Sequence, residues 1–221
     1  MMSIDALRFT NASYISGYYA KRSPQPQSLN IAKKMVQATV NSLSLEEFLA
    51  IPETEPESEF FDREIIQKPM PKGKHSAIQS EFTSWINSSL RLKRIARAFS
   101  ELRCTFGGMS IVPDISIFRW DLIVRDTNGE IANVFNLPPD WMIEILSPDQ
   151  RQTKLVKKIL FALKNGTEIA WLLDPDDKVI FIYRANQALQ IYDRPEQVLP
   201  MPDFASDLQL TVETIFSWLS E

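Results

Sequence analysis

Hydrophobic residues along this chain recur with two different periods, and each period predicts a different kind of element. Apolar positions spaced three or four residues apart predict amphipathic helices, whereas short continuous apolar runs bounded by turn residues predict buried strands. Helices are expected near residues 44–51, 75–92, 150–165 and 211–219. Strands are expected near residues 97–105, 111–118, 141–146, 169–173 and 179–183, after a hairpin-like pair around 58–69. This mixture predicts an α/β domain with a mixed sheet.

Residues 1–40 differ from the rest of the chain because they have mixed polarity without sustained periodicity. Within them, the stretch from Lys21 to Ser28 combines prolines with polar residues, which is typical of a linker. We therefore expect an N-terminal extension over 1–40 that stands outside the core, followed by one folded domain over 41–221.

The composition supports a single domain with one hydrophobic core, and it indicates the cellular compartment. The chain has 221 residues, of which 44% are hydrophobic, enough for one sizeable domain. Cys104 is the only cysteine, which excludes an internal disulfide and a cysteine-rich zinc site. The apolar runs are too short to span a bilayer, and Asp5 and Arg8 stand where a secretory signal would be apolar. We expect a cytoplasmic protein with no membrane partner.

Charge is unevenly distributed along the chain. The formal net charge of −4 argues against a protein that coats nucleic acid nonspecifically, because that mode of binding needs a broad basic field. Basic residues nevertheless concentrate in 63–103 and 151–164, while a group of glutamates lies between Glu46 and Glu59. A local basic surface is compatible with this pattern, although charge runs are more often solvated faces.

Two carboxylates stand inside predicted buried strands. Asp114 lies in the apolar run 111–118 and Glu144 in the run 141–146. A carboxylate loses hydration in such a place, so it is rarely kept there without a cation, a metal or a chemical task. If the two strands are neighbours in a suitable register, both acids converge at one end of the sheet and can bind one magnesium ion, which would serve phosphodiester hydrolysis. The alternative for Asp114 alone is that it accepts backbone hydrogen bonds at a strand end.

The same chemistry needs a cation near the phosphate. Many nucleases of this kind carry a lysine two residues after the glutamate, but position 146 is leucine. The helix that follows runs back along the strand, so a lysine near position 158 returns to the level of Glu144. The pattern of apolar residues places Lys157 and Lys158 at opposite margins of the stripe and does not choose between them; from spacing alone Lys158 is a solvated lysine. The stripe consists of Leu155, Val156, Ile159, Leu160 and Leu163.

Six segments between residues 43 and 219 resemble, in order, the Uma-two family of putative restriction endonucleases. They are Glu59-Phe-Phe-Asp-Arg-Glu-Ile-Ile, Lys74-His75-Ser-Ala-Ile, Val112-Pro-Asp114-Ile-Ser, Trp141-Met-Ile-Glu144-Ile-Leu-Ser-Pro, Lys158-Ile-Leu-Phe-Ala-Leu-Lys-Asn-Gly166 and Ala170-Trp-Leu-Leu-Asp-Pro175. That family is placed in the PD-(D/E)XK nuclease superfamily. The resemblance implies a restriction-endonuclease-like α/β fold, with a mixed central sheet flanked by helices, and DNA as the substrate.

The resemblance also implies roles for individual residues. Asp114 and Glu144 would be the metal-binding pair for magnesium or manganese, and Lys158 would be the lysine that has moved from the strand to the helix. His75 matches a position that the family usually fills with histidine, which makes it a candidate catalytic residue; by its place at a helix start it is more often a capping or packing residue. Where the family usually has Asp-Gly-Glu, this chain has Asp62-Arg63-Glu64, which weighs against a tight hairpin turn.

Two functions from different classes follow. The first is a magnesium-dependent endodeoxyribonuclease. The second is a noncatalytic module that keeps the fold and binds nucleic acid or a protein partner, with a homodimer as one form that the protein could take. The first requires that the Asp114 and Glu144 carboxylates lie within reach of one metal ion, with a lysine pointing into the same cleft.

Overall fold

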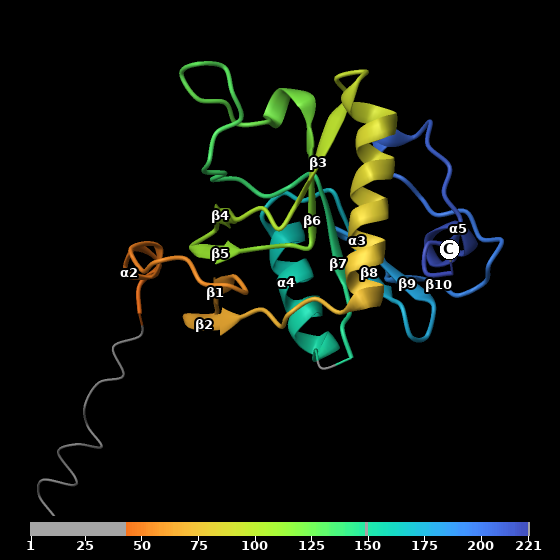
Figure 1. Ribbon diagram of the computed structural model, residues 1–221, viewed down its shortest axis with the longest axis horizontal. Helices are drawn as coiled ribbons and strands as arrows, with labels where there is room; N and C mark the ends of the chain where they lie inside the picture. Colours follow the sequence, from red (N-terminus) through yellow and green to blue (C-terminus); the bar gives the residue numbers. More distant parts are fainter. Residues whose placement is uncertain (1–42, 149, 221) are drawn as a thin grey trace, which may run out of the picture. The chain divides into compact units, whose positions relative to one another are not determined.

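A six-stranded mixed sheet forms the centre of the computed structural model, which describes residues 43–148 and 150–220 (Figure 1). The strands β7 and β8 are parallel, and every other neighbouring pair in this sheet is antiparallel. The predicted mixed sheet is therefore confirmed, whereas the extension expected over 1–40 lies outside the described residues. In spatial order the strands are β10 (Gln190–Tyr192), β9 (Val179–Arg184), β8 (Ile169–Asp174), β7 (Trp141–Ile145), β6 (Ile115–Arg119) and β3 (Ala96–Ser100).

Helices cover both faces of this sheet because its central strands are apolar on both sides. The alternate residues Trp141, Ile143 and Ile145 of β7 belong to a core with helices α3 (Gly73–Ile86) and α5 (Val212–Ser217). Met142 belongs to a second core with helix α4 (Gln152–Lys164) on the other face. Helix α4 is also the crossover that a parallel β7–β8 pair requires. Glu144, two residues from Met142, is thereby directed toward α4.

A smaller antiparallel sheet, with the order β2-β1-β5-β4, packs beside the first one (Figure 1). The sequence pattern predicted single strands over 97–105 and 111–118, but each stretch divides between the two sheets. The first breaks at Glu101, whose φ is 50°, and the second breaks at Pro113 and Asp114. The strands are β1 (Ser58–Phe61), β2 (Glu64–Gln67), β4 (Cys104–Phe106) and β5 (Met109–Ile111).

The β1–β2 hairpin closes with a tight turn, although the absence of glycine between Asp62 and Glu64 argued against one. Phe61 pairs with Glu64, so only Asp62 and Arg63 form the turn, with φ angles of 53° and 64°. Two successive residues in the left-handed region are typical of a type I′ turn, in which glycine is preferred at the second position. The four residue pairs of the hairpin and the burial of Phe61 hold Arg63 in this strained conformation.

We expect Arg63→Gly to raise the free energy of unfolding by about 0.5–1 kcal/mol, because glycine adopts a positive φ without a steric penalty. Urea unfolding would measure this change. Arg63→Ala is the matched control, since it removes the same exposed charge but keeps the Cβ atom, and it should give no comparable gain. Equal gains from both variants would show that loss of the charge, and not relief of the backbone, is responsible.

The remaining elements follow the predicted order with shifted bounds. Helix α2 (Leu45–Leu49) begins at the Ser44 capping box, in which the Ser44 and Glu47 side chains each accept the other residue's backbone N–H. Helix α3 ends at Ile86 and continues as one turn of π-helix, η1 (Asn87–Arg91). The remaining helical elements are two short 3-10 turns, η2 (Trp120–Leu122) and η3 (Asp203–Ala205). Over 43–148 and 150–220, no helix combines the length and the apolar character needed to cross a membrane.

Candidate functional site

The two strand acids lie at the same end and on the same face of the central sheet. Strands β6 and β7 pair Ile115 with Ile143, and continuing this antiparallel register by one residue sets Asp114 against Glu144. Both are buried, and Asp114 Oδ2 accepts a hydrogen bond of 2.7 Å from the backbone N–H of Ile145. The two acids are therefore neighbours at one end of the sheet, while a cation shared between them and their roles stay predictions.

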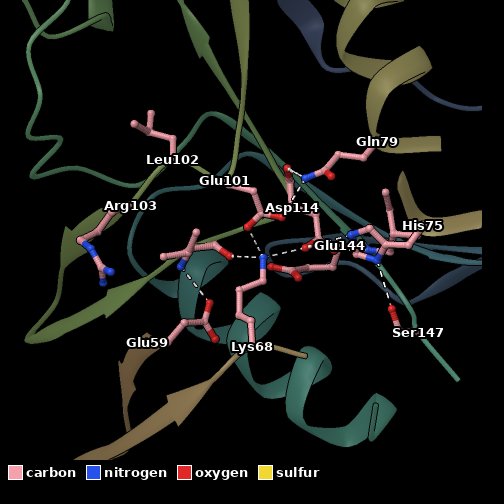
Figure 2. A network of polar contacts seen from close by, with 12 residues as sticks. Glu59, Lys68, His75, Gln79, Glu101, Leu102, Arg103, Asp114, Glu144 and Ser147 are labelled. Carbon is pink, nitrogen blue, oxygen red and sulfur yellow. Dashed lines mark hydrogen bonds and ion pairs between the residues drawn. The ribbon is translucent and has the colours of Figure 1, made fainter. Parts of the chain in front are cut away.

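A lysine that the sequence analysis did not single out reaches the centre of this acid cluster. Lys68 follows β2 and is buried, and its Nζ lies 2.8 Å from Asp114 Oδ1 and 2.6 Å from Glu101 Oε2 (Figure 2). It also donates a hydrogen bond of 2.9 Å to the carbonyl oxygen of Val112. Burial alone would lower the pKa of Lys68, but the carboxylates of Asp114, Glu144 and Glu101 outweigh burial and raise it. Lys68 is therefore an ammonium ion held by oxygen atoms.

Helix α3 supplies the other side of the cluster. Gln79 donates hydrogen bonds to Glu101 Oε1 at 2.9 Å and to the Asp114 carbonyl oxygen at 2.8 Å. His75 is neither a cap nor a simple packing residue: its Nδ1 lies 3.2 Å from Ser147 Oγ, and its Nε2 lies 3.5 Å from Asp114 Oδ1 (Figure 2). That Nε2 is buried and has no hydrogen-bond partner among the described residues.

Lys158 of α4 is buried beside Glu144, so the interpretation of Lys158 as a solvated lysine is wrong. Its Nζ lies 2.8 Å from Glu59 Oε1 and 2.9 Å from Glu144 Oε1. The buried face of α4 includes Lys158 and Ala162, whereas Leu160 of the predicted stripe is 52% exposed. The side chain of Lys157 is 70% exposed, which settles which of the two lysines enters the site.

Glu144 lacks the hydrogen bonds that a buried carboxylate needs. Its Oε1 lies 2.9 Å from the Lys158 ammonium, an ion-pair contact, whereas its Oε2 has no hydrogen-bond partner in the described part of the chain. Burial raises the pKa of Glu144 to about 8 against the opposing effect of Lys158. Asp114 differs, because Lys68 and His75 outweigh burial and hold its pKa well below its ordinary value. The acid that is short of a partner is thus Glu144.

The charges in the cluster do not balance. Two lysines, Lys68 and Lys158, face four carboxylates, so the fully ionised cluster carries two negative charges more than positive ones. This excess equals the charge of one divalent cation with the opposite sign. Glu144 Oε2 and His75 Nε2 have no hydrogen-bond partner among the described residues, and both are ligand atoms of the kinds that such an ion uses, so the residues fit a divalent metal. The four acids are Glu59, Glu101, Asp114 and Glu144.

Two clefts meet at Lys68. A groove of about 370 Å³ lies between the β1–β2 hairpin and the start of α4, with Lys158 and Glu59 among its lining residues. A second cleft of about 200 Å³ is lined by His75 and Asp114, among others. Lys68 lines both. The larger groove is also lined by the basic residues Arg151, Lys154 and Lys157.

The structure brings together all four residues named from the sequence: Asp114, Glu144, Lys158 and His75. It adds four that the sequence analysis did not assign to the site: Glu59, Lys68, Gln79 and Glu101. Glu59 carried a usable signal, because it is an acid in the apolar strand 58–61, just as Glu144 is in its own strand. Lys68 and Glu101 stand in turns and loops, where no periodicity marks a charged residue as buried.

Comparisons with known proteins show the family of the chain and a similar solved structure. A crystal structure of a putative nuclease belonging to DUF820 from Anabaena variabilis is similar, with a TM-score of 0.79 and 59% identity, over 80% of this chain and 98% of that chain. A cryo-electron-microscopy structure of a DrdV–DNA complex gives a TM-score of 0.33 at 14% identity, over 53% of this chain and 10% of that chain, which is too weak to support an inference. No curated protein matches. The family model described as Uma2, putative restriction endonuclease, matches residues 45–213, and the chain therefore belongs to the Uma2 family.

Proposed function

We propose that this protein is a divalent-metal-dependent endonuclease that hydrolyses phosphodiester bonds in DNA. The observation that carries the proposal is the Glu144 carboxylate, which is fully buried and set against Asp114; Lys158 contacts its Oε1, but its Oε2 has no hydrogen-bond partner among the described residues. A buried carboxylate oxygen in that state is destabilising unless a further cation completes its surroundings. The membership of the chain in a nuclease family supports DNA as the substrate.

Asp114 and Glu144 would hold the metal, magnesium or manganese, through carboxylate oxygens. Such an ion, when bound, supplies polarisation of a phosphate oxygen and an activated water. Lys158 would keep the Glu144 carboxylate oriented through their 2.9 Å contact and would stabilise negative charge that develops on the phosphate. His75 would orient Asp114 from the opposite side, because it lies between Ser147 and that carboxylate.

The groove beside the site supports a polyanionic substrate. Arg151, Lys154 and Lys157 line it, and all three are exposed. Basic side chains along such a groove attract a phosphate backbone despite the negative net charge of the whole protein. Binding through these residues would weaken as salt is raised.

One observation favours the second candidate, a noncatalytic module with the same fold. Lys68 contacts both Asp114 and Glu101 and offsets one of their two negative charges without any metal, so internal ion pairs hold this half of the cluster together. Such a protein would bind duplex DNA or a protein partner but would not cleave DNA in the presence of divalent metals.

The decisive test is cleavage of supercoiled plasmid DNA across a titration of magnesium and manganese, beside Glu144→Gln. The wild-type protein should nick or linearise the plasmid only with metal, and Glu144→Gln should be slower by at least about 100-fold, because a ligand of the ion is lost. Glu130→Gln, at an exposed position in the loop after η2, is the matched control and should cleave at the wild-type rate. Equal rates for wild type and Glu144→Gln would contradict the proposal, and no cleavage by the wild-type protein with either metal would favour the noncatalytic module.

A further inference from the structure

The Lys68 ammonium is surrounded like a metal ion. Its three contacts are Asp114 Oδ1 at 2.8 Å, Glu101 Oε2 at 2.6 Å and the carbonyl oxygen of Val112 at 2.9 Å. Two carboxylates and a backbone carbonyl are the oxygen ligands that magnesium, manganese and calcium take in proteins. Figure 2 shows the ammonium at the point where these side chains converge.

A second observation points to the same place. His75 is 6% exposed, and its Nε2 has no hydrogen-bond partner in the described part of the chain although it faces Asp114 Oδ1 at 3.5 Å. One ligand atom each from His75, Glu101 and Asp114 lie within 4.8 Å of one another, which is close enough to surround a single ion. An unpartnered buried nitrogen beside two acids is unfavourable for a site that only has to hold a lysine.

We propose that Lys68 is a built-in cation that occupies the position of the divalent ion in the metal-free protein, and that a metal entering there displaces its ammonium from Asp114 and Glu101. The inference rests on the proposed function, because it takes the nuclease metal as the occupant; Asp114 is the ligand common to both, and His75 and Glu101 would join it as ligands. Two cations cannot share these oxygens, since their mutual repulsion in a buried cluster would be large. Metal binding and the Lys68 contacts therefore exclude each other.

The displaced side chain has a place to go. Lys68 lines both clefts, the smaller one with His75 and Asp114 and the larger basic groove with Lys158 and Glu59. Moving its ammonium out of the acid cluster toward the groove would add a cation beside Arg151, Lys154 and Lys157, which line that groove. A fixed structural role for Lys68 predicts instead that its ammonium stays on Asp114 and Glu101 when metal is added, so that the reactivity of its amine toward solvent does not change.

The test compares manganese binding to the wild-type protein, Lys68→Met and Lys68→Gln by isothermal titration calorimetry and by the electron paramagnetic resonance signal of free Mn²⁺. Both variants should bind Mn²⁺ at least about tenfold more tightly than wild type, a change of about 1.4 kcal/mol, because no ammonium has to be displaced. Lys157→Met is the matched control, since Lys157 lines the same groove outside the acid cluster. Adding Asp114→Asn to Lys68→Met should remove the gain.

A second measurement needs no substitution at Lys68. Acetylation of wild-type lysines by an activated ester, read by mass spectrometry, should increase at Lys68 when magnesium is added, while Lys157 serves as the exposed reference. Unchanged acetylation of Lys68, or unchanged Mn²⁺ affinity in both Lys68 variants, overturns the inference and leaves the proposed function standing if metal-dependent cleavage persists. Absence of Mn²⁺ binding in the wild type and in both variants overturns the inference and the proposed function together.

Discussion

Replacing Asp114 by asparagine is expected to lower the metal-dependent cleavage rate by about 1000-fold or more, because several kcal/mol of transition-state stabilisation depend on the ion that this carboxylate would hold. Asparagine keeps the shape of the side chain and one oxygen that can accept the N–H of Ile145. The substitution therefore changes the charge at the site with little change in packing. Single-turnover cleavage of plasmid DNA measures the rate, and the apparent affinity for Mn²⁺ should fall in parallel.

The fold should survive this change. Lys68 keeps its 2.6 Å contact with Glu101 in the absence of the Asp114 charge, so its ammonium is not left unpaired. Urea unfolding of the same preparation would show that the lost cleavage is not lost structure. Asp207→Asn, at an exposed position near the C-terminus, is the control and should leave the rate unchanged. A rate for Asp114→Asn within tenfold of wild type would be incompatible with a metal ligand at this position.

Lys158→Met should have the largest effect on stability, lowering the free energy of unfolding by about 3–5 kcal/mol, because it leaves two buried carboxylates without their cation. Glu59 Oε1 and Glu144 Oε1 lie 2.8 and 2.9 Å from the ammonium of Lys158, a residue that is 4% exposed. Burial alone would lower the pKa of Lys158, but the carboxylates of Glu144 and Glu59 outweigh burial and raise that pKa. Urea unfolding at pH 8 would measure the loss.

Matched variants separate charge from packing at this position. Lys157→Met removes an exposed lysine from the same helix and should change stability by less than about 0.5 kcal/mol. Combining Glu144→Gln with Lys158→Met should recover a large part of the loss, since a buried charge is removed along with its partner. If Lys158→Met alone is as stable as Lys157→Met, the contacts of Lys158 contribute nothing measurable and its assignment to the buried cluster is wrong.

The acids of the site could be found from the sequence because a charge inside an apolar strand is physically costly. Asp114 and Glu144 stood out for that reason, and the same rule would have found Glu59. Lys158 differs from these acids. The apolar stripe of its helix does not decide whether Lys157 or Lys158 enters the site, and only the family resemblance favours Lys158. The structure shows why, since the helical face that packs on the sheet leaves Leu160 in solvent and buries Lys158 through its ion pairs.

The architecture was predictable at the level of element type and order, but the division into two sheets was not. Strands β4 and β5 each have three residues, too few for a periodic pattern to register. The breaks at Glu101 and at Pro113–Asp114 depend on long-range contacts, including the bond from the Glu101 N–H to the Asp114 carbonyl oxygen at 3.2 Å. Glu101 enters the site at the first of these breaks and Lys68 in the loop after β2, so neither residue lies in a periodic pattern that marks it as buried.

The acids and bases of the cluster come from different sheets. Glu59 belongs to β1 and Lys68 follows β2 of the small sheet, whereas Asp114 and Glu144 stand at the end of the large one. The ion pair between Lys68 and Asp114 therefore links the two sheets. A movement of the β1–β2 hairpin away from the large sheet would withdraw Glu59 and Lys68 from the cluster together. A natural substitution at one of these residues would be tolerated most readily together with a compensating substitution of its ion-pair partner in the other sheet.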